Sequence, residues 1–208
     1  MARRTKVDAL ATRHSLLDAA ELLFQVQGVS RTSLNDIARS AGTSRGAIYW
    51  HFKDKADLFN AMMERVTLPL EQAFQFQIPA TALGTDPLES LRQVMHQAML
   101  KIATDPRTRR VFEVATQKVE YVDELQAVRV RHLTVRNEFL VQMEHGLALA
   151  AATQSLAMRV PVGNAAQGLH AMADGLIQNW LLDSTAFDLV AISRQLIDVY
   201  LKGLGFKI

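Results

Sequence analysis

Residues 33–58 read SLNDIARSAGTSRGAIYWHFKDKADL, and this stretch determines how the first part of the chain is expected to fold. Ser33 is suited to cap a short helix, because an acidic residue follows three positions later, as in a capping box. Gly42 lies where that helix ends, and Ser44 is suited to cap a second short helix. Two short helices joined by so tight a turn predict a helix-turn-helix.

The second helix of this pair carries side chains suited to DNA, since the second helix of such a motif enters the major groove. Arg45, in its first turn, could reach a guanine edge or a phosphate. The other residues that could contact DNA are Thr43, Ser44, Gly46, Tyr49, Trp50, His51, Lys53 and Lys55. Aromatic residues at a helix end often pack in a core instead, as Phe52 is expected to do, so the pattern alone leaves DNA binding open.

Most of the chain has the pattern of helices, because apolar residues recur at intervals of three and four and β-branched alternation is rare. The helices expected are 7–27, 34–40, 44–50, 54–68, 88–104, 107–119, 124–158, 164–182 and 187–204. Prolines and a glycine between 69 and 87 predict a variable connection after the fourth helix. We therefore predict an all-α fold of about nine to ten helices.

Composition narrows the class of protein. Hydrophobic residues make up 49% of the 208 residues and charged residues 21%, which is typical of a folded protein. No cysteine, signal-peptide pattern or membrane-length apolar run is found, so we expect a cytoplasmic protein with no membrane association. Residues 1–55 hold nine basic and five acidic side chains, whereas the rest of the chain has a small acidic excess, so a polyanionic partner is expected at the basic end.

The same stretch, 33–58, closely resembles the signature of the TetR family of transcriptional regulators. The matching elements are Ile37-Ala38, Ala41-Gly42, the run from Gly46 to Phe52, and Lys55 with Leu58. The one small departure is Thr43, where valine is frequent in the family. The resemblance implies a three-helix DNA-binding domain over 1–53 and a helical ligand-binding and dimerisation bundle over 54–208.

The resemblance also implies roles for single residues. Those expected mostly to hold phosphates are Ser33, Thr43, Ser44, Tyr49, His51 and Lys55. Those expected to face the groove are Arg45, Gly46 and Trp50, with Arg45 the best candidate for reading a base. The tail residues Arg3, Arg4 and Lys6 would add phosphate or minor-groove contacts, unless the tail is simply solvated.

The C-terminal part resembles a narrower group, the AcrR-type repressors of multidrug efflux pumps. The resemblance is carried by DPRTRRVFEV at 105–114, DGLIQNWLL at 174–182 and FDL at 187–189. It implies a ligand-responsive repressor that binds a palindromic operator, controls an efflux pump and is released from DNA by hydrophobic small molecules. The alternative is a TetR-type regulator of a different operon, metabolic or stress-related, with another inducer.

Helix 164–182 could form part of a ligand pocket. An apolar stripe runs along it, and His170, Asp174 and Gln178 form a polar line beside the stripe. Asp174 is a candidate polar anchor in an apolar cavity, although this line could equally face solvent or a dimer partner. The other expected pocket residues are Met95, Ala98, Met99, Phe112, Thr116, Phe139, Met143, Ala173 and Ile177, any one of which could simply fill the core.

The resemblance implies a homodimer, and we expect the helices near 130–156 and 164–182 to form its interface. An enzyme is the main alternative class. The six histidines show no metal-ligand spacing, and no nucleophile motif, phosphate-binding loop or dinucleotide fingerprint is found. We therefore predict no catalytic residues, no metal and no cofactor.

Overall fold

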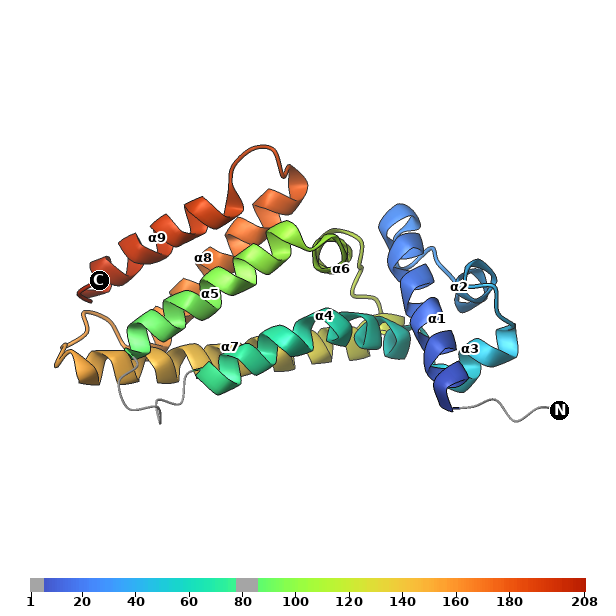
Figure 1. Ribbon diagram of the computed structural model, residues 1–208, viewed down its shortest axis with the longest axis horizontal. Helices are drawn as coiled ribbons and strands as arrows, with labels where there is room; N and C mark the ends of the chain where they lie inside the picture. The colour runs from blue at the N-terminus through green and yellow to red at the C-terminus, as the bar shows by residue number, and fades with distance from the viewer. Residues whose placement is uncertain (1–5, 78–85) are drawn as a thin grey trace. The chain divides into compact units, whose positions relative to one another are not determined.

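The computed structural model describes residues 6–77 and 86–208, and the side chains of 6–72 and 86–208. Arg3, Arg4 and most of the predicted variable connection lie outside these residues. The helices (Figure 1) are α1 (Lys6–Gln27), α2 (Leu34–Ser40), α3 (Arg45–His51), α4 (Lys55–Gln77), α5 (Pro87–Thr104), α6 (Pro106–Gln117), the short 3-10 helix η1 (Asp123–Leu125), α7 (Gln126–Thr153), α8 (Val162–Leu182) and α9 (Leu189–Leu204). No strand occurs in the described part, which confirms the all-α prediction. No described helix is both long and apolar enough to cross a membrane.

Several helix ends are determined by single polar residues. The predicted capping box is confirmed, because the Ser33 hydroxyl accepts from the Asp36 backbone N–H and the Asp36 carboxylate accepts from the Ser33 N–H. At α9, the Asp188 carboxylate accepts from two backbone N–H groups of the first turn. That helix ends at Gly205, whose φ of 107° is a left-handed conformation that glycine adopts without steric cost.

Two predicted helix ends were wrong. The fourth helix does not end near Leu68 but continues to Gln77, with Pro69 inside it. Pro69 has no backbone N–H, so the helix lacks one hydrogen bond there, and it continues on the backbone hydrogen bonds of the neighbouring residues. Helix α7 ends at Thr153, before the predicted end at 158, and Ser155 has a positive φ of 49° just beyond it.

The chain divides into two compact units. The first comprises Met1–Thr67 and Arg110–Leu133, and the second comprises Leu68–Arg109 and Thr134–Ile208. This division differs from the boundary predicted after residue 53. The reason is packing, since residues 111–128 contribute to the same buried cluster as the helix-turn-helix.

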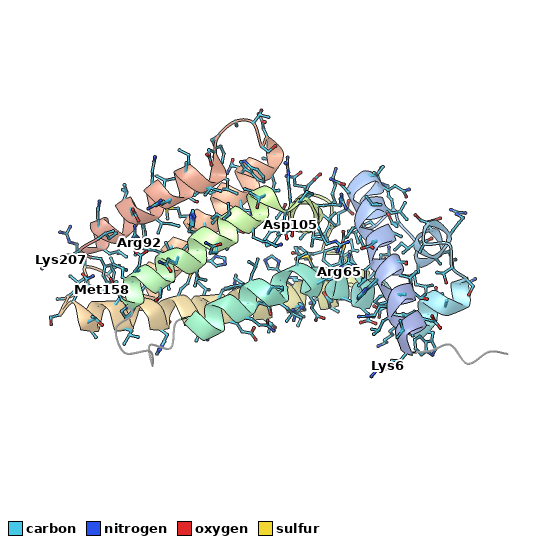
Figure 2. The ribbon with its side chains drawn as sticks, viewed as in Figure 1. Lys6, Arg65, Arg92, Asp105, Met158 and Lys207 are labelled. Atoms are coloured by element: carbon cyan, nitrogen blue, oxygen red, sulfur yellow. The ribbon has the colours of Figure 1, made fainter. Side chains whose placement is uncertain are left out.

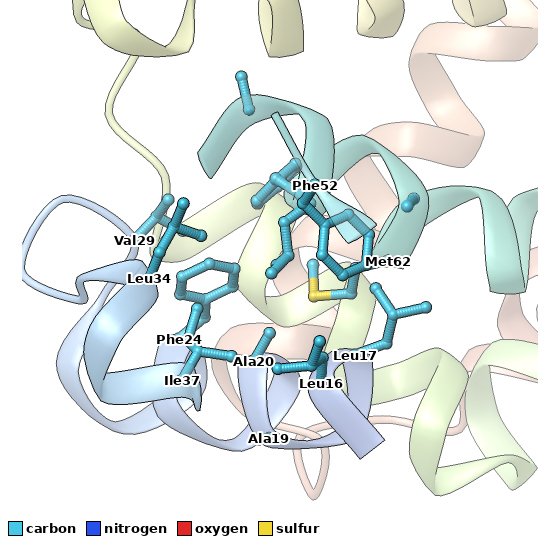
Figure 3. Close-up of a cluster of buried hydrophobic side chains, with 14 of the residues drawn as sticks. Leu16, Leu17, Ala19, Ala20, Phe24, Val29, Leu34, Ile37, Phe52 and Met62 are labelled. Carbon is cyan, nitrogen blue, oxygen red and sulfur yellow. The ribbon is translucent and has the colours of Figure 1, made fainter. Parts of the chain in front are cut away.

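The core of the first unit lies where α1, α2, α3 and the start of α4 meet (Figure 3). Phe24 is fully buried, and its ring centroid lies 6.1 Å from that of Phe59. Other members of the cluster are Leu16, Leu17, Ala20, Ile37, Ile48, Phe52, Met62, Val111, Val114, Leu125 and Val128. Burial of this apolar surface holds the short helices, which are too short to be stable alone.

In the second unit, α9 packs against both α5 and α8. Arg92 of α5, labelled in Figure 2, donates two hydrogen bonds to the Asp198 carboxylate of α9, at 2.8 and 2.9 Å. The Tyr200 hydroxyl donates to the Ala165 carbonyl of α8 at 2.9 Å. A Cβ at Gly168 would lie 2.3 Å from that hydroxyl oxygen, so α8 and α9 approach closely where α8 has no side chain.

Candidate nucleic-acid interface

Helices α2 and α3 form the predicted helix-turn-helix. The Thr43 N–H donates to the Ala38 carbonyl at 2.9 Å, which closes the turn between them. Gly42 within that turn has a φ of 65°, a conformation that favours glycine. Ile37 of α2 and Ile48 of α3 are both fully buried in the core of the first unit, so apolar packing sets the position of α3.

Most of the surface of α3 is exposed, because Ile48 is the one residue that this helix buries. Trp50 is 73% exposed and Tyr49 48% exposed. The guanidinium of Arg45 lies 5.8 Å from the centroid of the Tyr49 ring, one helical turn away, where the two can attract each other. The predicted residues that gather on α3 and the turn before it are Thr43, Ser44, Arg45, Gly46, Tyr49 and Trp50.

Ser33 is exposed, but its hydroxyl is already engaged at the start of α2. It donates to the Asp36 carboxylate at 2.6 Å and accepts from the Asp36 N–H at 3.2 Å. The hydrogen bonds from the Ser33 side chain and backbone, together with the nearby charge of Arg39, hold the pKa of Asp36 below its ordinary value. A phosphate contact from Ser33 would compete with this cap.

The C-terminal end of α3 is held by a residue that the sequence did not single out. Arg13 of α1 donates to the His51 carbonyl at 3.2 Å, and its guanidinium lies 4.4 Å from the centroid of the Phe52 ring. The His51 ring lies edge-on to that of Trp50, with 4.6 Å between centroids. Arg13 is 38 residues from His51 in the chain, and no local pattern predicts such a contact.

The two lysines that follow α3 occupy different environments. Lys53 is exposed, and its backbone N–H donates to the Asp57 carboxylate at 2.9 Å. Lys55 is buried, and its ammonium lies 3.2 Å from the Val29 carbonyl. The position of Lys55 therefore gives no support to its predicted contact with phosphate, whereas Lys53 is accessible to DNA.

The predicted ligand-binding residues are divided between the two units. Phe112 and Thr116 lie in the first unit, where Phe112 packs against the core and the Thr116 hydroxyl donates to the Phe112 carbonyl. The others lie in the second unit: Met95, Met99, Met143 and Ala173 are buried, Ala98, Phe139, His170, Asp174 and Ile177 are half-buried, and Gln178 is exposed. The Gln178 amide donates to the Asp174 carboxylate at 2.5 Å, so the polar line is partly satisfied within α8.

A groove of about 400 Å³ lies between α5 and α9 of the second unit. Its lining residues are Glu89, Arg92, Gln93, His96, Gln97, Arg194, Ile197 and Asp198, and none of them was predicted to bind a ligand. The charge of Arg92 is matched there by Glu89 and Asp198. Over the described residues, no cluster of histidine, aspartate and glutamate has the arrangement of a metal site.

Comparisons with known proteins agree with this geometry. Residues 16–62 match the family model for bacterial regulatory proteins of the tetR family, and residues 86–206 match the model for the C-terminal region of MAATS-type transcriptional repressors. Among curated proteins, the chain is 36% identical to the transcriptional regulator AcrR of Shigella flexneri, over 97% of this chain and 93% of that protein.

Two solved structures are also similar. NalD, described as the secondary repressor of the MexAB-OprM multidrug efflux pump in Pseudomonas aeruginosa, is 36% identical with a TM-score of 0.86, over 96% of this chain and 98% of NalD. SmeT of Stenotrophomonas maltophilia, in a complex with triclosan, is 30% identical with a TM-score of 0.82, over 93% of this chain and 91% of that chain. The exposed recognition helix, the two family models and the full-length similarity lead to one conclusion: the chain belongs to the tetR family of bacterial regulatory proteins.

Proposed function

We propose that this protein is a ligand-responsive transcriptional repressor that binds a palindromic operator as a homodimer and controls a multidrug efflux pump. The observation that carries the proposal is the exposed face of α3, where Arg45, Tyr49 and Trp50 are available to DNA while Ile48 anchors the helix. The roles of NalD and AcrR support the choice of an efflux regulator. Such a protein acts in the cytoplasm, where the chromosome lies, and we assign it no catalytic step.

Within this proposal, the residues of the helix-turn-helix divide into two groups. Arg45 reads a base edge in the major groove, and Gly46 and Trp50 face the same groove. The residues proposed to position the protein on phosphates are Ser33, Thr43, Ser44, Tyr49, His51 and Lys53. Phosphate contacts provide affinity that weakens with salt, whereas the base contact provides sequence preference.

We propose that the dimer forms through α8 and α9. Large apolar side chains are exposed on these helices, with Leu182 at 73% and Val199 at 65%, and Leu196 lies on the same stretch of α9. Exposed apolar surface of this kind favours burial against a second copy. The interface predicted from the sequence, between the helices near 130–156 and 164–182, stays the alternative, because Val130 and Val141 of α7 are exposed as well. Sedimentation of the protein as a monomer at micromolar concentration would contradict the proposed dimer.

We propose that the inducer is a hydrophobic or aromatic small molecule. Met95, Met99 and Met143 supply adaptable apolar walls, and Asp174 with its Gln178 partner supplies a polar anchor. The triclosan complex of SmeT is consistent with this class of ligand. To release DNA, the inducer must bind the DNA-free conformation more tightly than the DNA-bound one.

The proposal is tested by fluorescence anisotropy on labelled DNA from upstream of the gene and its neighbours, at physiological salt. We expect a dissociation constant of about 10⁻⁸ M or lower, with a clear preference over unrelated DNA of equal length. Added hydrophobic drugs should lower the anisotropy of the operator complex. Equal, weak binding to both DNAs would reject specific repression at that locus, and tight binding that no such drug reverses would favour an operon with another inducer.

A further inference from the structure

Lys55, the first residue of α4, has a buried ammonium group. Its side chain is 9% exposed. The Nζ atom lies 3.2 Å from the Val29 carbonyl oxygen, 3.3 Å from the Ser30 carbonyl oxygen and 3.4 Å from the carboxylate of Glu124. An ammonium has three N–H donors, and here three acceptor groups surround it. Because each donor has a partner inside the protein, none is left for a phosphate.

The carbonyls that Lys55 binds belong to the turn between α1 and α2. In this turn Gly28 has a φ of 83°, and the buried Thr32 hydroxyl donates to the Gly28 carbonyl at 2.8 Å. Val29 is fully buried, and its carbonyl accepts from the Thr32 backbone N–H at 3.3 Å in addition to Lys55. Lys55 supplies a donor to that carbonyl and to the next one along the chain.

The same turn is bonded to the connection between α6 and α7. The Val29 N–H donates to the Lys118 carbonyl at 3.0 Å, and the Ser30 hydroxyl lies 3.3 Å from the Glu120 carboxylate. Glu124, in η1 of this connection, completes the contact through Lys55. One ammonium thus joins the segment that enters the helix-turn-helix, the segment that leaves it after Phe52, and the α6–α7 connection.

We propose that Lys55 is a positioning residue for the recognition helix α3 and not a phosphate ligand. By joining the chain before α2 to the chain after α3, it holds both ends of the helix-turn-helix at one place. Glu124 contributes to the same role, because its contact with Lys55 connects both ends of the helix-turn-helix to the α6–α7 connection. The proposal rests on the proposed function, since it assumes that α3 binds operator DNA.

The first test compares Lys55→Met with Lys53→Met, each of which removes one positive charge and keeps much of the aliphatic stem. For Lys53→Met we expect affinity to fall equally on operator and unrelated DNA, and the slope of log K against log salt to decrease by about 0.9. For Lys55→Met we expect operator affinity to fall by roughly ten-fold or more, because the contact that joins the α1–α2 turn, the start of α4 and Glu124 is lost and α3 is displaced. Its salt slope and its affinity for unrelated DNA should match those of the parent protein.

A second variant decides the question if Lys55→Met does not fold. Glu124→Gln removes a carboxylate that is 58% exposed and leaves every lysine in place. If Lys55 could hold a phosphate, releasing it from Glu124 would strengthen DNA binding and steepen the salt slope. A positioning role predicts the opposite, namely weaker operator binding with an unchanged slope. Asp123→Asn, the neighbouring exposed residue in η1, is the matched control for loss of one negative charge.

Weaker operator binding by Glu124→Gln, with Asp123→Asn equal to the parent, supports the proposal. Operator binding that is unchanged or stronger with Glu124→Gln overturns it, as does a loss of about 0.9 in salt slope with Lys55→Met. Failure of the proposed function would show differently, because the parent protein itself would then show no preference for its operator.

Discussion

The two units of the molecule differ in what they bury. Among the described residues, the first unit buries two charged side chains, Glu21 and Lys55, whereas the buried polar residues of the second unit carry hydroxyls only: Ser90, Thr108 and Ser193. Buried charge adds little net stability, but it penalises any arrangement in which the partners separate. The first unit must present α3 in one position, and the second must adapt to ligands, so each has the kind of interior that its proposed role requires.

The largest expected effect tests this difference at Glu21. Its carboxylate, 1% exposed, contacts the Arg65 guanidinium of α4 and lies 3.6 Å from that of Arg110. We expect Glu21→Leu to lower the free energy of unfolding of the first unit by about 3 kcal/mol, because Arg65 and Arg110 lose their buried counter-charge, although Arg65 keeps the half-exposed Asp18 at 2.8 Å. Urea denaturation followed by circular dichroism measures the change.

The double variant Glu21→Leu with Arg65→Met is the control for this experiment. Replacing Arg65 as well should recover part of the lost stability, since the Arg110 guanidinium still lacks Glu21 in this variant. We expect it nevertheless to bind operator DNA less tightly, because an apolar contact permits more than one arrangement of α1 and α4. If the double variant is as unstable as the single one, Glu21 and Arg65 stabilise the first unit through packing. The two units would then not differ in their dependence on buried charge.

The next effect concerns the exposed face of α3. Arg45→Met should reduce the preference for operator over unrelated DNA by about 1–3 kcal/mol, the usual worth of a bidentate contact with a base. Competition anisotropy with both DNAs measures this preference. Tyr49→Phe keeps the ring that lies beside Arg45 and should preserve most of it. An equal loss of affinity on both DNAs would assign Arg45 to phosphate instead.

Whether the sequence could predict a contact of the fold or of the candidate site depends on how far apart its partners lie along the chain. The ends of α2 and α3 were predictable, because Ser33, Gly42 and Ser44 act on backbone groups within a few residues. The contacts of Arg13 and Lys55 were not predictable, since the partner of Arg13 lies 38 residues away along the chain and those of Lys55 lie 25, 26 and 69 residues away. A lysine after a recognition helix looks like a phosphate ligand until its surroundings are known.

The second unit shows the same limit. The pattern of apolar residues predicted its helices, and family resemblance implied its role, but periodicity identifies only which face of a helix is apolar. It does not say whether that face meets a ligand, the core or another chain. The exposed Leu182 and Val199 illustrate this, because both belong to apolar runs and neither is buried in the described structure.

A smaller effect compares one helix cap from each unit. Ser33→Ala removes the cap of α2 and Asp188→Ala removes that of α9. Each should lower the free energy of unfolding by about 1 kcal/mol. We expect only Ser33→Ala to weaken operator binding as well, because α2 supports α3 and because Ser33 is itself proposed to contact a phosphate. Thermal melts and anisotropy on the same samples test this, and equal weakening by both variants would contradict independent roles for the two units.

The smallest effects concern carboxylates whose pKa is lowered, namely Asp36 in the first unit and Asp105 and Asp183 in the second. The hydrogen bond from Lys101, with smaller contributions from Thr108 and the Arg107 backbone, lowers the pKa of Asp105 from 3.8 to about 2. Asp36 is shifted in the same direction by Ser33. A carboxylate with a lowered pKa in the folded state stabilises the fold above its unfolded pKa, and this contribution is lost as the pH falls through the folded value.

For Asp105 that loss should therefore extend from about pH 4 down to about pH 2. Lys101→Met should raise the pKa of Asp105 toward 3.8 and leave that of Asp36 unchanged, and Ser33→Ala should do the reverse. Carboxyl NMR titration of the parent and the two variants measures both values. If Asp105 of the parent titrates near 3.8, the contacts that lower its pKa, first of all the one with Lys101, do not persist in solution, as is usual for exposed charge pairs.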